Sequence, residues 1–360
     1  MDYNHLKDYY KAKKVFLTGH TGFKGSWMLL CLDILGAEVK GYALAPETAY
    51  DLYPSVGGDN LCHSVIADIR DKERLEKEIL DFQPDYIFHL AAQPLVRLSY
   101  KIPSETFAVN AIGTANVLES VNKLKKRCEV ICITTDKVYE NLEWHYPYRE
   151  SDRLGGFDPY SASKACAELI INSFRQSFFS KERYNIHNKS LCSVRAGNVI
   201  GGGDWAEDRI IPDIIRSLKD DKTINIRNPF AIRPWQHVME TIAAYLHIGS
   251  KLLENPTQYS EAWNIGPQAD DNRTVEKLVQ EALSVWGKGI YETPKLENQP
   301  HEAGLLKLDI NKSTNELKWM PKYNSEKAIR ITIDWYKKVI IGKLSAKQIT
   351  QEQIKEYLFG

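Results

Sequence analysis

Short apolar runs alternate with longer segments of helical periodicity along the first half of the chain. The runs are rich in Val, Ile, Leu and Phe, which predicts buried strands. In the longer segments apolar residues recur three and four positions apart, which predicts helices. Strands that alternate with helices are typical of an α/β fold whose parallel sheet is covered on both faces. The predicted strands are residues 15–17, 39–44, 64–67, 86–90, 129–134 and 191–194, and the predicted helices are residues 26–35, 71–82, 104–124 and 160–179.

The pattern changes after residue 194. Residues 201–205, Gly-Gly-Gly-Asp-Trp, open a region rich in loops and prolines. We therefore expect a first domain at residues 1–194 and a smaller α/β lobe, mainly substrate-binding, at residues 195–360. A helical segment at about 236–255 is expected to rejoin the first domain.

Composition excludes several classes of protein. The chain has 47 basic and 47 acidic residues, so no net charge attracts it to nucleic acid or to a membrane surface. No apolar run is long enough to cross a bilayer, and the first residues lack the apolar stretch of a signal peptide. The six cysteines lack the spacing of a zinc site or of a disulfide framework, so we expect no metal and a cytoplasmic protein.

A glycine-rich loop follows the first predicted strand and opens a helix. Its glycines permit a tight turn and allow backbone N–H groups to approach a pyrophosphate at the helix N-terminus. At this place in a parallel sheet, the loop predicts dinucleotide binding and a Rossmann-type doubly wound fold. An ordinary loop remains the alternative. The loop is Gly19-His20-Thr21-Gly22-Phe23-Lys24-Gly25, and its candidate cofactor-binding residues are Gly19, Thr21, Gly22, Phe23, Lys24 and Gly25.

Two further strand ends are candidates for cofactor binding. Asp68 and Ile69 follow the third strand, where the carboxylate can accept a hydrogen bond from an adenine amino group. Ala91, Ala92 and Gln93 follow the fourth, where small residues leave room for a cofactor. The end of the second strand has neither a carboxylate for a ribose diol nor an arginine for a 2′-phosphate. The choice between NAD and NADP therefore stays open at this strand.

A tyrosine and a lysine stand one helical turn apart at the start of the last predicted helix. Tyr160 and Lys164 lie on one face of that helix. A nearby ammonium group is expected to lower the pKa of the tyrosine towards the working pH. Such a tyrosine can take the proton of a sugar hydroxyl while a hydride leaves the same carbon.

The end of the fifth strand adds a second set of chemical groups. Thr135 can donate a hydrogen bond to a sugar oxygen that becomes a carbonyl. Asp136 and Lys137 add an acid–base pair that a simple alcohol oxidation does not require. An exposed ion pair at a capped strand end is the alternative for these two residues.

Together these motifs resemble the CDP-glucose 4,6-dehydratase branch of the extended short-chain dehydrogenase family. The resemblance covers nearly the whole chain. The phosphate loop and the Tyr-x-x-x-Lys pair identify only the superfamily, whereas Thr-Asp-Lys is more specific, because related dTDP-glucose dehydratases place glutamate where Lys137 stands. The matching segments are residues 19–25, 134–141, 160–164, 194–205, 233–238 and 263–266.

The resemblance implies a lyase that uses NAD and acts on a nucleotide sugar. Tyr160 would take the proton of the glucose C4 hydroxyl as hydride passes to NAD. Asp136 and Lys137 would then serve the elimination of water across C5 and C6, with their assignment as acid and base left open. Hydride return to C6 regenerates the cofactor, which favours NAD.

The resemblance also indicates substrate contacts. Asn198 and the loop that contains Gly203, Asp204 and Trp205 resemble the substrate-binding segment of the family. Two arginines, Arg209 and Arg233, are candidates for the substrate pyrophosphate, because guanidinium groups bind phosphate oxygens in pairs. Structural salt bridges are the alternative for both arginines, and a core role is the alternative for Trp205.

Four other functions remain open. A nucleotide-sugar 4-epimerase has the same fold, cofactor and Tyr–Lys pair as those expected here. A 4,6-dehydratase that acts on another nucleotide sugar is a further alternative. An inverting UDP-N-acetylhexosamine 4,6-dehydratase has an Asp-Lys pair but generally lacks the tyrosine found at position 160. A non-catalytic dinucleotide-binding protein need not keep these groups together.

We also expect a homodimer or a larger homo-oligomer. Two long predicted helices carry apolar residues on more than one face, so that one face can cover the sheet while another meets a partner helix. Internal packing of all these residues is the alternative. The residues are Val109, Ile112, Val117, Leu118 and Val121 in one helix, and Leu169, Ile170, Ile171 and Phe174 in the other.

Overall fold

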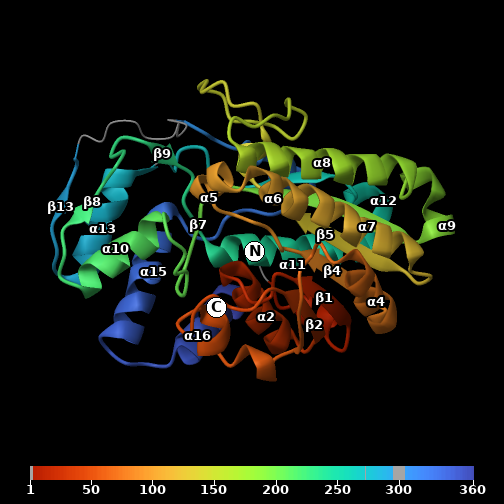
Figure 1. Cartoon of the computed structure of the whole chain (residues 1–360), viewed down its shortest axis with the longest axis horizontal. Helices are drawn as coiled ribbons and strands as arrows, with labels where there is room; N and C mark the ends of the chain where they lie inside the picture. The colour runs from red at the N-terminus through yellow and green to blue at the C-terminus, as the bar shows by residue number, and fades with distance from the viewer. Residues whose placement is uncertain (1–2, 272, 295–304) are drawn as a thin grey trace.

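A seven-stranded parallel sheet forms the centre of the computed structural model, which describes residues 3–271, 273–294 and 305–360 (Figure 1). The strand order is β11-β6-β5-β4-β1-β2-β3, and every neighbouring pair is parallel. The predicted Rossmann-type sheet is thereby confirmed. The strands are β1 (Lys14–Thr18), β2 (Glu38–Ala43), β3 (His63–Ile66), β4 (Tyr86–His89), β5 (Cys128–Ile133), β6 (Lys189–Ala196) and β11 (Ala262–Ile265).

Helices cover both faces of the sheet, as its apolar strands require. Helices α2 and α11 pack on one face, and α4, α7 and α8 on the other (Figure 1). Every residue of β5 is buried because both faces are covered. The helices associated with the sheet are α1 (Leu6–Tyr10), α2 (Phe23–Leu35), α3 (Leu52–Ser55), α4 (Lys72–Phe82), α5 (Val96–Lys101), α6 (Pro103–Phe107), α7 (Gly113–Lys123), α8 (Pro159–Ser177), α9 (Tyr184–His187), α11 (Val238–Glu254) and α12 (Pro256–Tyr259).

Two predicted helices differ from the structure. Helix α2 begins at Phe23, three residues before the predicted start at Ser26, because the glycine loop leads directly into its first turn. The helix predicted at residues 104–124 is divided into α6 and α7 by a π-helical segment, Ala108–Ile112. Such wider turns are typical of functional sites.

The remaining elements lie mainly at one end of the sheet (Figure 1). Their short strands form two-stranded pairs, β7 with β10, β8 with β13 and β9 with β12. These strands are β7 (Val199–Ile200), β8 (Ile224–Asn225), β9 (Ile232–Arg233), β10 (Gln236–His237), β12 (Arg273–Thr274) and β13 (Tyr291–Glu292). The helices are α10 (Ile210–Lys219), α13 (Val275–Trp286), α14 (Asn311–Glu316), α15 (Ser325–Ile340) and α16 (Ala346–Phe359).

Residues that follow position 195 also contribute to the central sheet. Strand β11 pairs with β6 as a seventh strand, which the sequence pattern did not predict. Helix α11 packs against β5 and α2. We propose that the chain still divides near residue 195 for substrate binding. Among the helices of the described residues, none is long and apolar enough to span a bilayer.

Candidate active site

The predicted site residues follow the carboxyl ends of the parallel strands. The glycine loop follows β1, Asp68 follows β3, residues 91–93 follow β4 and residues 134–137 follow β5. The carboxyl edge is where open α/β sheets bind ligands, next to the point at which the strand order reverses. Here that point lies between β1 and β4, which pair with each other.

The glycine loop packs closely against backbone atoms, both its own and those that follow β4. Gly19 has φ +74°, and a Cβ there would lie 2.8 Å from the backbone nitrogen of Ala91. A Cβ on Gly25 would lie 2.0 Å from the Gly19 carbonyl oxygen. Gly22 precedes the first turn of α2, is exposed, and no side chain caps the helix there. The free N–H groups of that turn can therefore receive a pyrophosphate.

The side chains of the loop point in different directions. The Thr21 hydroxyl donates to the Leu44 carbonyl at 2.8 Å and so ties the loop to the end of β2. The Phe23 ring approaches Gly201, where a Cβ would lie 3.1 Å from its Cζ. Burial, with the charges of Arg209 and Lys164, lowers the pKa of Lys24 to about 7. Lys24 therefore lies among the charged groups of the site.

The candidates after β3 and β4 are held by neighbouring side chains. Both carboxylate oxygens of Asp68 accept from Arg70, with the shortest distance at 2.6 Å. The backbone N–H of Gln93 donates to Asn110 Oδ1 at 2.9 Å, and Asn110 Nδ2 donates to Ser163 at 2.9 Å. Ile69 is buried, and Ala91 and Ala92 are half-buried.

His89, at the end of β4, is a fully hydrogen-bonded histidine of the core. Its Nδ1 lies 2.8 Å from the Thr18 hydroxyl and its Nε2 lies 3.0 Å from the Thr114 hydroxyl. Burial lowers the pKa of His89 to about 3, which keeps the ring neutral. His89 is therefore a satisfied buried residue.

The end of β5 turns into a single 3-10 turn, Asp136–Val138. The Thr135 hydroxyl lies before this turn and donates to Asp136 Oδ1 at 3.0 Å. Asp136 is buried, and burial raises the pKa of its carboxyl group although Lys137, Thr135 and Arg233 act in the opposite direction. Lys137 is half-buried. An exposed ion pair does not describe this turn.

Tyr160 and Lys164 lie in the first two turns of α8, facing the end of β5. Lys164 Nζ donates to the Ile133 carbonyl at 3.2 Å, and Tyr160 interacts with the Thr135 hydroxyl. Burial raises the pKa of Tyr160 to about 12, so the expected lowering by Lys164 was wrong. Burial also lowers the pKa of Lys164 to about 8, against the effects of Cys132 and Glu168.

The loop at residues 201–205 is packed between the two parts of the molecule. Gly203 has φ +82°, and a Cβ there would lie 2.7 Å from Leu52 Cδ1. The Tyr336 hydroxyl donates to the Asp204 carbonyl at 2.5 Å. The Trp205 ring contacts that of Tyr336, with centroids 5.2 Å apart. Trp205 thus has a packing role in this loop.

Both arginine candidates reach the same site. Arg209 donates to Asp204 Oδ2 at 2.8 Å, and its charge also acts on Tyr160. Arg233 donates to the Ile232 carbonyl at 3.0 Å, and its charge acts on Asp136. The backbone carbonyl of Asn198 accepts from the N–H of Gln236 at 3.0 Å.

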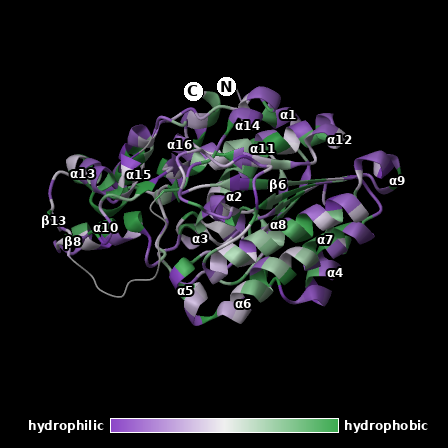
Figure 2. Ribbon diagram, turned by 90° about the horizontal axis from the view of Figure 1, so that it is seen from above, coloured by the Kyte–Doolittle hydropathy of each residue, from purple (hydrophilic) through white to green (hydrophobic). Residues whose placement is uncertain are grey.

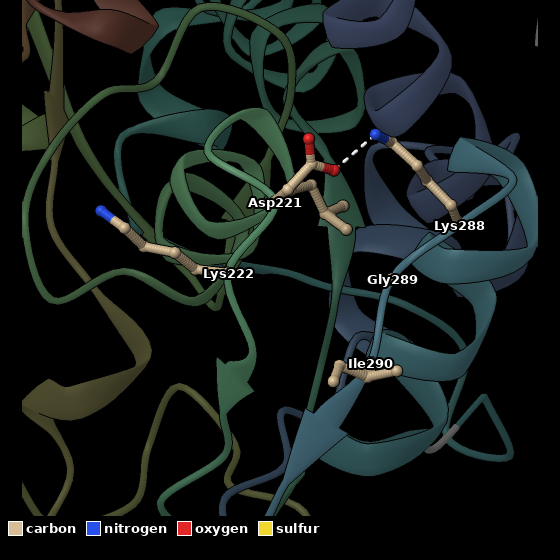
Figure 3. Close-up of a pocket in the computed structure, with 6 residues that line it drawn as sticks. Asp221, Lys222, Lys288, Gly289 and Ile290 are labelled. Atoms are coloured by element: carbon tan, nitrogen blue, oxygen red, sulfur yellow. Dashed lines mark hydrogen bonds and ion pairs between the residues drawn. The ribbon is translucent and has the colours of Figure 1, made fainter.

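A separate surface pocket lies away from these residues. Its lining includes no candidate site residue, and its entrance carries an ion pair between Lys288 and Asp221 (Figure 3). The pocket is lined by Leu218, Asp221, Lys222, Lys288, Gly289 and Ile290. It has no group suited to the chemistry described above.

Comparison with known proteins places the chain in a family. The model of the family described as GDP-mannose 4,6 dehydratase matches residues 16–332. The chain belongs to this family. The match extends from β1 into α15 and so includes every candidate residue of the site.

Relatives within and near the GDP-mannose 4,6 dehydratase family cover most of the chain. This chain is 47% identical over 337 residues to the CDP-glucose 4,6-dehydratase of Salmonella typhimurium, with 94% of each chain covered. It is 26% identical to the dTDP-glucose 4,6-dehydratase of Streptomyces antibioticus, with 90% of this chain and 92% of the relative covered.

Solved structures share the fold. The dTDP-glucose 4,6-dehydratase DesIV from Streptomyces venezuelae, crystallised with NAD, has a TM-score of 0.76 at 22% identity, covering 90% of this chain and 97% of its own. A UDP-glucose-4-epimerase from Stenotrophomonas maltophila, also with bound NAD, has a TM-score of 0.78 at 18% identity. That comparison covers 92% of this chain and 99% of the epimerase.

Two buried polar residues of the site were missed by the sequence analysis. Asn110 holds the turn after β4, and the π-helical segment that carries it has no clear sequence signal. Glu168 accepts from Thr134 at 2.5 Å, one residue before Thr135. Its position four residues after Lys164 places it on the same face of α8, which is the signal that was available.

Proposed function

We propose that this protein is an NAD-dependent CDP-glucose 4,6-dehydratase. It converts CDP-D-glucose to CDP-4-dehydro-6-deoxy-D-glucose and water. The observation that carries the proposal is the 47% identity to a CDP-glucose 4,6-dehydratase over nearly the whole of both chains. The buried Asp136, whose charge acts on Tyr160, and the neighbouring Lys137 support an elimination in addition to an oxidation.

The glycine loop fits the pyrophosphate of NAD. The cradle formed by Gly19 and Gly25 leaves no room for side chains, and the first turn of α2 offers uncapped N–H groups. When bound, NAD supplies the hydride acceptor for C4 and the hydride donor for C6. The residues proposed to hold it are Gly19, Thr21, Gly22, Phe23, Lys24, Gly25, Asp68, Ile69, Ala91, Ala92, Gln93, Tyr160 and Lys164.

Tyr160 is the proposed base of the oxidation step. Its phenolate oxygen takes the proton of the C4 hydroxyl, while Thr135 donates a hydrogen bond to the same sugar oxygen. Lys164 stabilises the phenolate that Tyr160 requires for this role. Burial raises the pKa of Tyr160 to about 12, whereas the hydrogen bond with Thr135 and the charge of Arg209 lower it.

Asp136 and Lys137 are the proposed acid and base of the elimination. The 4-ketone acidifies the C5 proton, which Lys137 removes. The electron pair of that C–H bond forms the C5–C6 double bond, and the C6–O bond breaks. Asp136 gives its proton to the leaving hydroxyl group, which departs as water. Burial raises the pKa of Asp136, so that its carboxyl group holds a proton more readily than an exposed one.

The substrate pyrophosphate is proposed to bind to arginines. Arg209 and Arg233 both act electrostatically on catalytic residues, so they lie within reach of a sugar bound there. Asp204 already pairs with Arg209 and holds its guanidinium in place. Asn198, Gly203 and Trp205 are the other proposed substrate contacts.

The experiment is incubation with CDP-, dTDP-, UDP- and GDP-glucose, followed by mass analysis. We expect the loss of one water molecule, with CDP-glucose consumed faster than the other three. Equal or faster turnover of dTDP-glucose would contradict the assignment of the nucleotide. Formation of an isomer without loss of water would instead indicate a 4-epimerase.

We further propose a homodimer formed through α7 and α8. Ile112, which immediately precedes α7, is 56% exposed, and Leu169 of α8 is 58% exposed. Figure 2 looks down on these helices and shows hydrophobic residues among their outer turns. Val117, Leu118, Val121 and Ile171 are buried against the sheet instead. A second copy of the chain is the proposed partner for the exposed residues.

We propose that the enzyme acts in the cytoplasm. All six cysteines are free thiols in the structure, and four of them are buried. Free thiols are usual in reducing compartments.

A further inference from the structure

Glu168 is a buried carboxylate that has no role in the reaction proposed above. Its side chain lies in α8 and is fully enclosed between that helix and strands β5 and β6. One oxygen accepts from the Thr134 hydroxyl at 2.5 Å. The other accepts from the Ser193 hydroxyl at 2.9 Å and from Arg195 at 2.8 Å. A charge so deep in a protein is costly unless it is paired and hydrogen-bonded, and here three donors bind the carboxylate, one of them the charged Arg195.

The helix presents three polar side chains in series to the end of β5. Tyr160, Lys164 and Glu168 follow one another at four-residue intervals, so they lie along one face of α8. Tyr160 interacts with Thr135, Lys164 donates to the carbonyl of Ile133, and Glu168 accepts from Thr134. Each residue from 133 to 135 is therefore held by a different turn of the helix.

The same carboxylate also reaches the far side of the catalytic turn. Arg195, paired with Glu168, donates a second hydrogen bond to the Tyr139 hydroxyl at 2.9 Å. Tyr139 ends the turn that contains Asp136 and Lys137. Its hydroxyl donates in turn to Asn264 Oδ1 on β11 at 2.7 Å. Thr134 before the turn and Tyr139 after it are thus both tied to Glu168, one directly and one through Arg195.

We propose that Glu168 is a positioning residue, which fixes the Thr135-Asp136-Lys137 turn relative to the Tyr160–Lys164 pair. The proposal rests on the proposed function, because only a reaction that uses both groups in one active site requires this alignment. Glu168 touches neither substrate nor cofactor in this role. A displacement of about 1 Å at such a site can lower a rate by about 100-fold.

The charge state of Glu168 agrees with this role. Burial alone would raise the pKa of its carboxyl group, but Arg195 and the hydrogen bonds from Thr134 and Ser193 outweigh burial and lower it. Glu168 therefore stays ionised, and an ionised carboxylate forms stronger and shorter hydrogen bonds than a neutral acid.

Two hydroxyl groups that bind the same carboxylate allow a matched test. Thr134→Val removes the hydrogen bond on the catalytic strand β5 side, whereas Ser193→Ala removes the one on β6. Both variants lose one buried hydrogen bond, so we expect similar decreases in Tm. We expect kcat to fall about 10- to 100-fold in Thr134→Val, with KM little changed, and to stay near the parent value in Ser193→Ala.

A conservative variant separates the hydroxyl group from the shape of the side chain. Thr134→Ser keeps the donor to Glu168 and should restore most of kcat. Glu168→Gln is a poorer test, because it leaves Arg195 buried without its charged partner and is expected to lower Tm together with kcat. The decision therefore rests on the Thr134 and Ser193 variants.

Equal values of kcat in Thr134→Val and Ser193→Ala would overturn the proposal and make Glu168 a purely structural residue. Failure of Thr134→Ser to restore kcat would overturn it as well. In each case the kcat of the variant is divided by the kcat of the parent enzyme, with whichever nucleotide sugar the parent converts as the substrate. The proposed function is tested separately, by the parent's own substrate and product.

Discussion

Tyr160 and Lys164 are both buried, and burial moves the pKa values of their side chains in opposite directions, away from each other. The pKa of Tyr160 rises to about 12, and the pKa of Lys164 falls to about 8. Near neutral pH the pair is therefore a neutral phenol beside a group that is still largely protonated. The phenolate needed for proton transfer is a minor species, so catalysis depends strongly on whatever positive charge lies beside it.

Replacement of Tyr160 by phenylalanine tests this dependence. Tyr160→Phe removes one hydroxyl and barely changes packing, but it deletes the proposed acceptor of the C4 proton. We expect kcat to fall by about 10²- to 10⁴-fold, while the affinities for NAD and CDP-glucose stay close to those of the parent. Steady-state rates and calorimetric binding measure the two effects. Activity within about twofold of the parent would show that another group accepts the proton.

Replacement of Lys137 by alanine tests the division between oxidation and elimination. Oxidation at C4 requires no group at C5 or C6, so Lys137→Ala should still form a 4-keto sugar. We expect the reaction to stop there in a single turnover, with near-ultraviolet absorbance from the reduced nicotinamide and no loss of water from the sugar. Mass analysis of the quenched mixture identifies the ketone.

Lys355→Ala, an exposed substitution on α16, is the control and should behave as the parent. Dehydration by Lys137→Ala at the parent rate would make Lys137 dispensable. Failure to oxidise at all would assign Lys137 to the first step or to substrate placement.

At the scale of elements, α8 serves two purposes with opposite faces. One face carries Tyr160, Lys164 and Glu168 towards the end of β5, and Ile171, seven residues after Lys164, continues this face into the core. The opposite face exposes Leu169. Because a helix repeats every 3.6 residues, its 19 residues present both faces over several turns.

The exposed face is open to a direct test. Leu169→Glu places a charge in the proposed interface between copies of α7 and α8. We expect the mass measured by light scattering to fall from that of two or more chains to that of one, with little change in Tm measured at low protein concentration. Leu344→Glu is the control, because Leu344 is similarly exposed, at 51%, but lies outside these helices. A parent that is already a single chain at micromolar concentration would reject the dimer.

Much of this architecture was accessible from sequence because long elements carry strong periodic signals. The six predicted strands and the second and last of the predicted helices agree with the structure in type and approximate place. Strand β11 was missed because Ala262–Ile265 is only four residues long and carries a buried asparagine. The break between α6 and α7 depends on backbone hydrogen bonds, which a pattern of apolar positions does not reveal.

The sequence predicted which residues form the site better than it predicted the pKa values of their side chains. Loops that follow parallel strands necessarily meet at one edge, so Thr135 and Tyr160 come together as the motifs suggested. The pKa of Tyr160 was not predictable, because it depends on burial by residues distant in sequence. Glu168 was overlooked because a single glutamate in a helix is usually a solvent-exposed residue.

At the scale of the whole molecule, a second buried carboxylate ties α11 to the C-terminal part of the chain. Glu240, in the first turn of α11, accepts from the Tyr357 hydroxyl at 2.6 Å and from the N–H of Tyr323 at 2.7 Å. Burial raises the pKa of its carboxyl group from 4.5 to about 7. The folded protein therefore binds a proton at Glu240 more tightly than the unfolded chain does.

Stability should consequently depend on pH through Glu240. A raised pKa in the folded state contributes stability that is complete below pH 4.5 and is lost as the pH rises to about 7. The free energy of unfolding of the parent, relative to that of Glu240→Gln, should fall over this interval by up to about 3 kcal/mol. Urea unfolding between pH 5 and pH 8, at fixed protein concentration, measures the difference.

Glu254→Gln, at the other end of α11, is the matched control. Lys251 and Tyr9 bind the Glu254 carboxylate and lower its pKa, although burial acts in the opposite direction. Its contribution should therefore stay constant above pH 5. A parallel pH dependence in the parent and in Glu240→Gln would show that Glu240 is not responsible.

The return of β11 and α11 to the central sheet has a consequence for synthesis on the ribosome. Six of the seven strands are available once residue 196 has emerged, but the outer edge of β6 stays unpaired until residue 265 follows. One face of β5 likewise waits for α11. An open strand edge beside an uncovered apolar face is the surface most prone to wrong association. The nascent chain therefore passes through about 70 residues of elongation, roughly 4 to 14 seconds at about 5–20 residues per second, in which it is most exposed to wrong association.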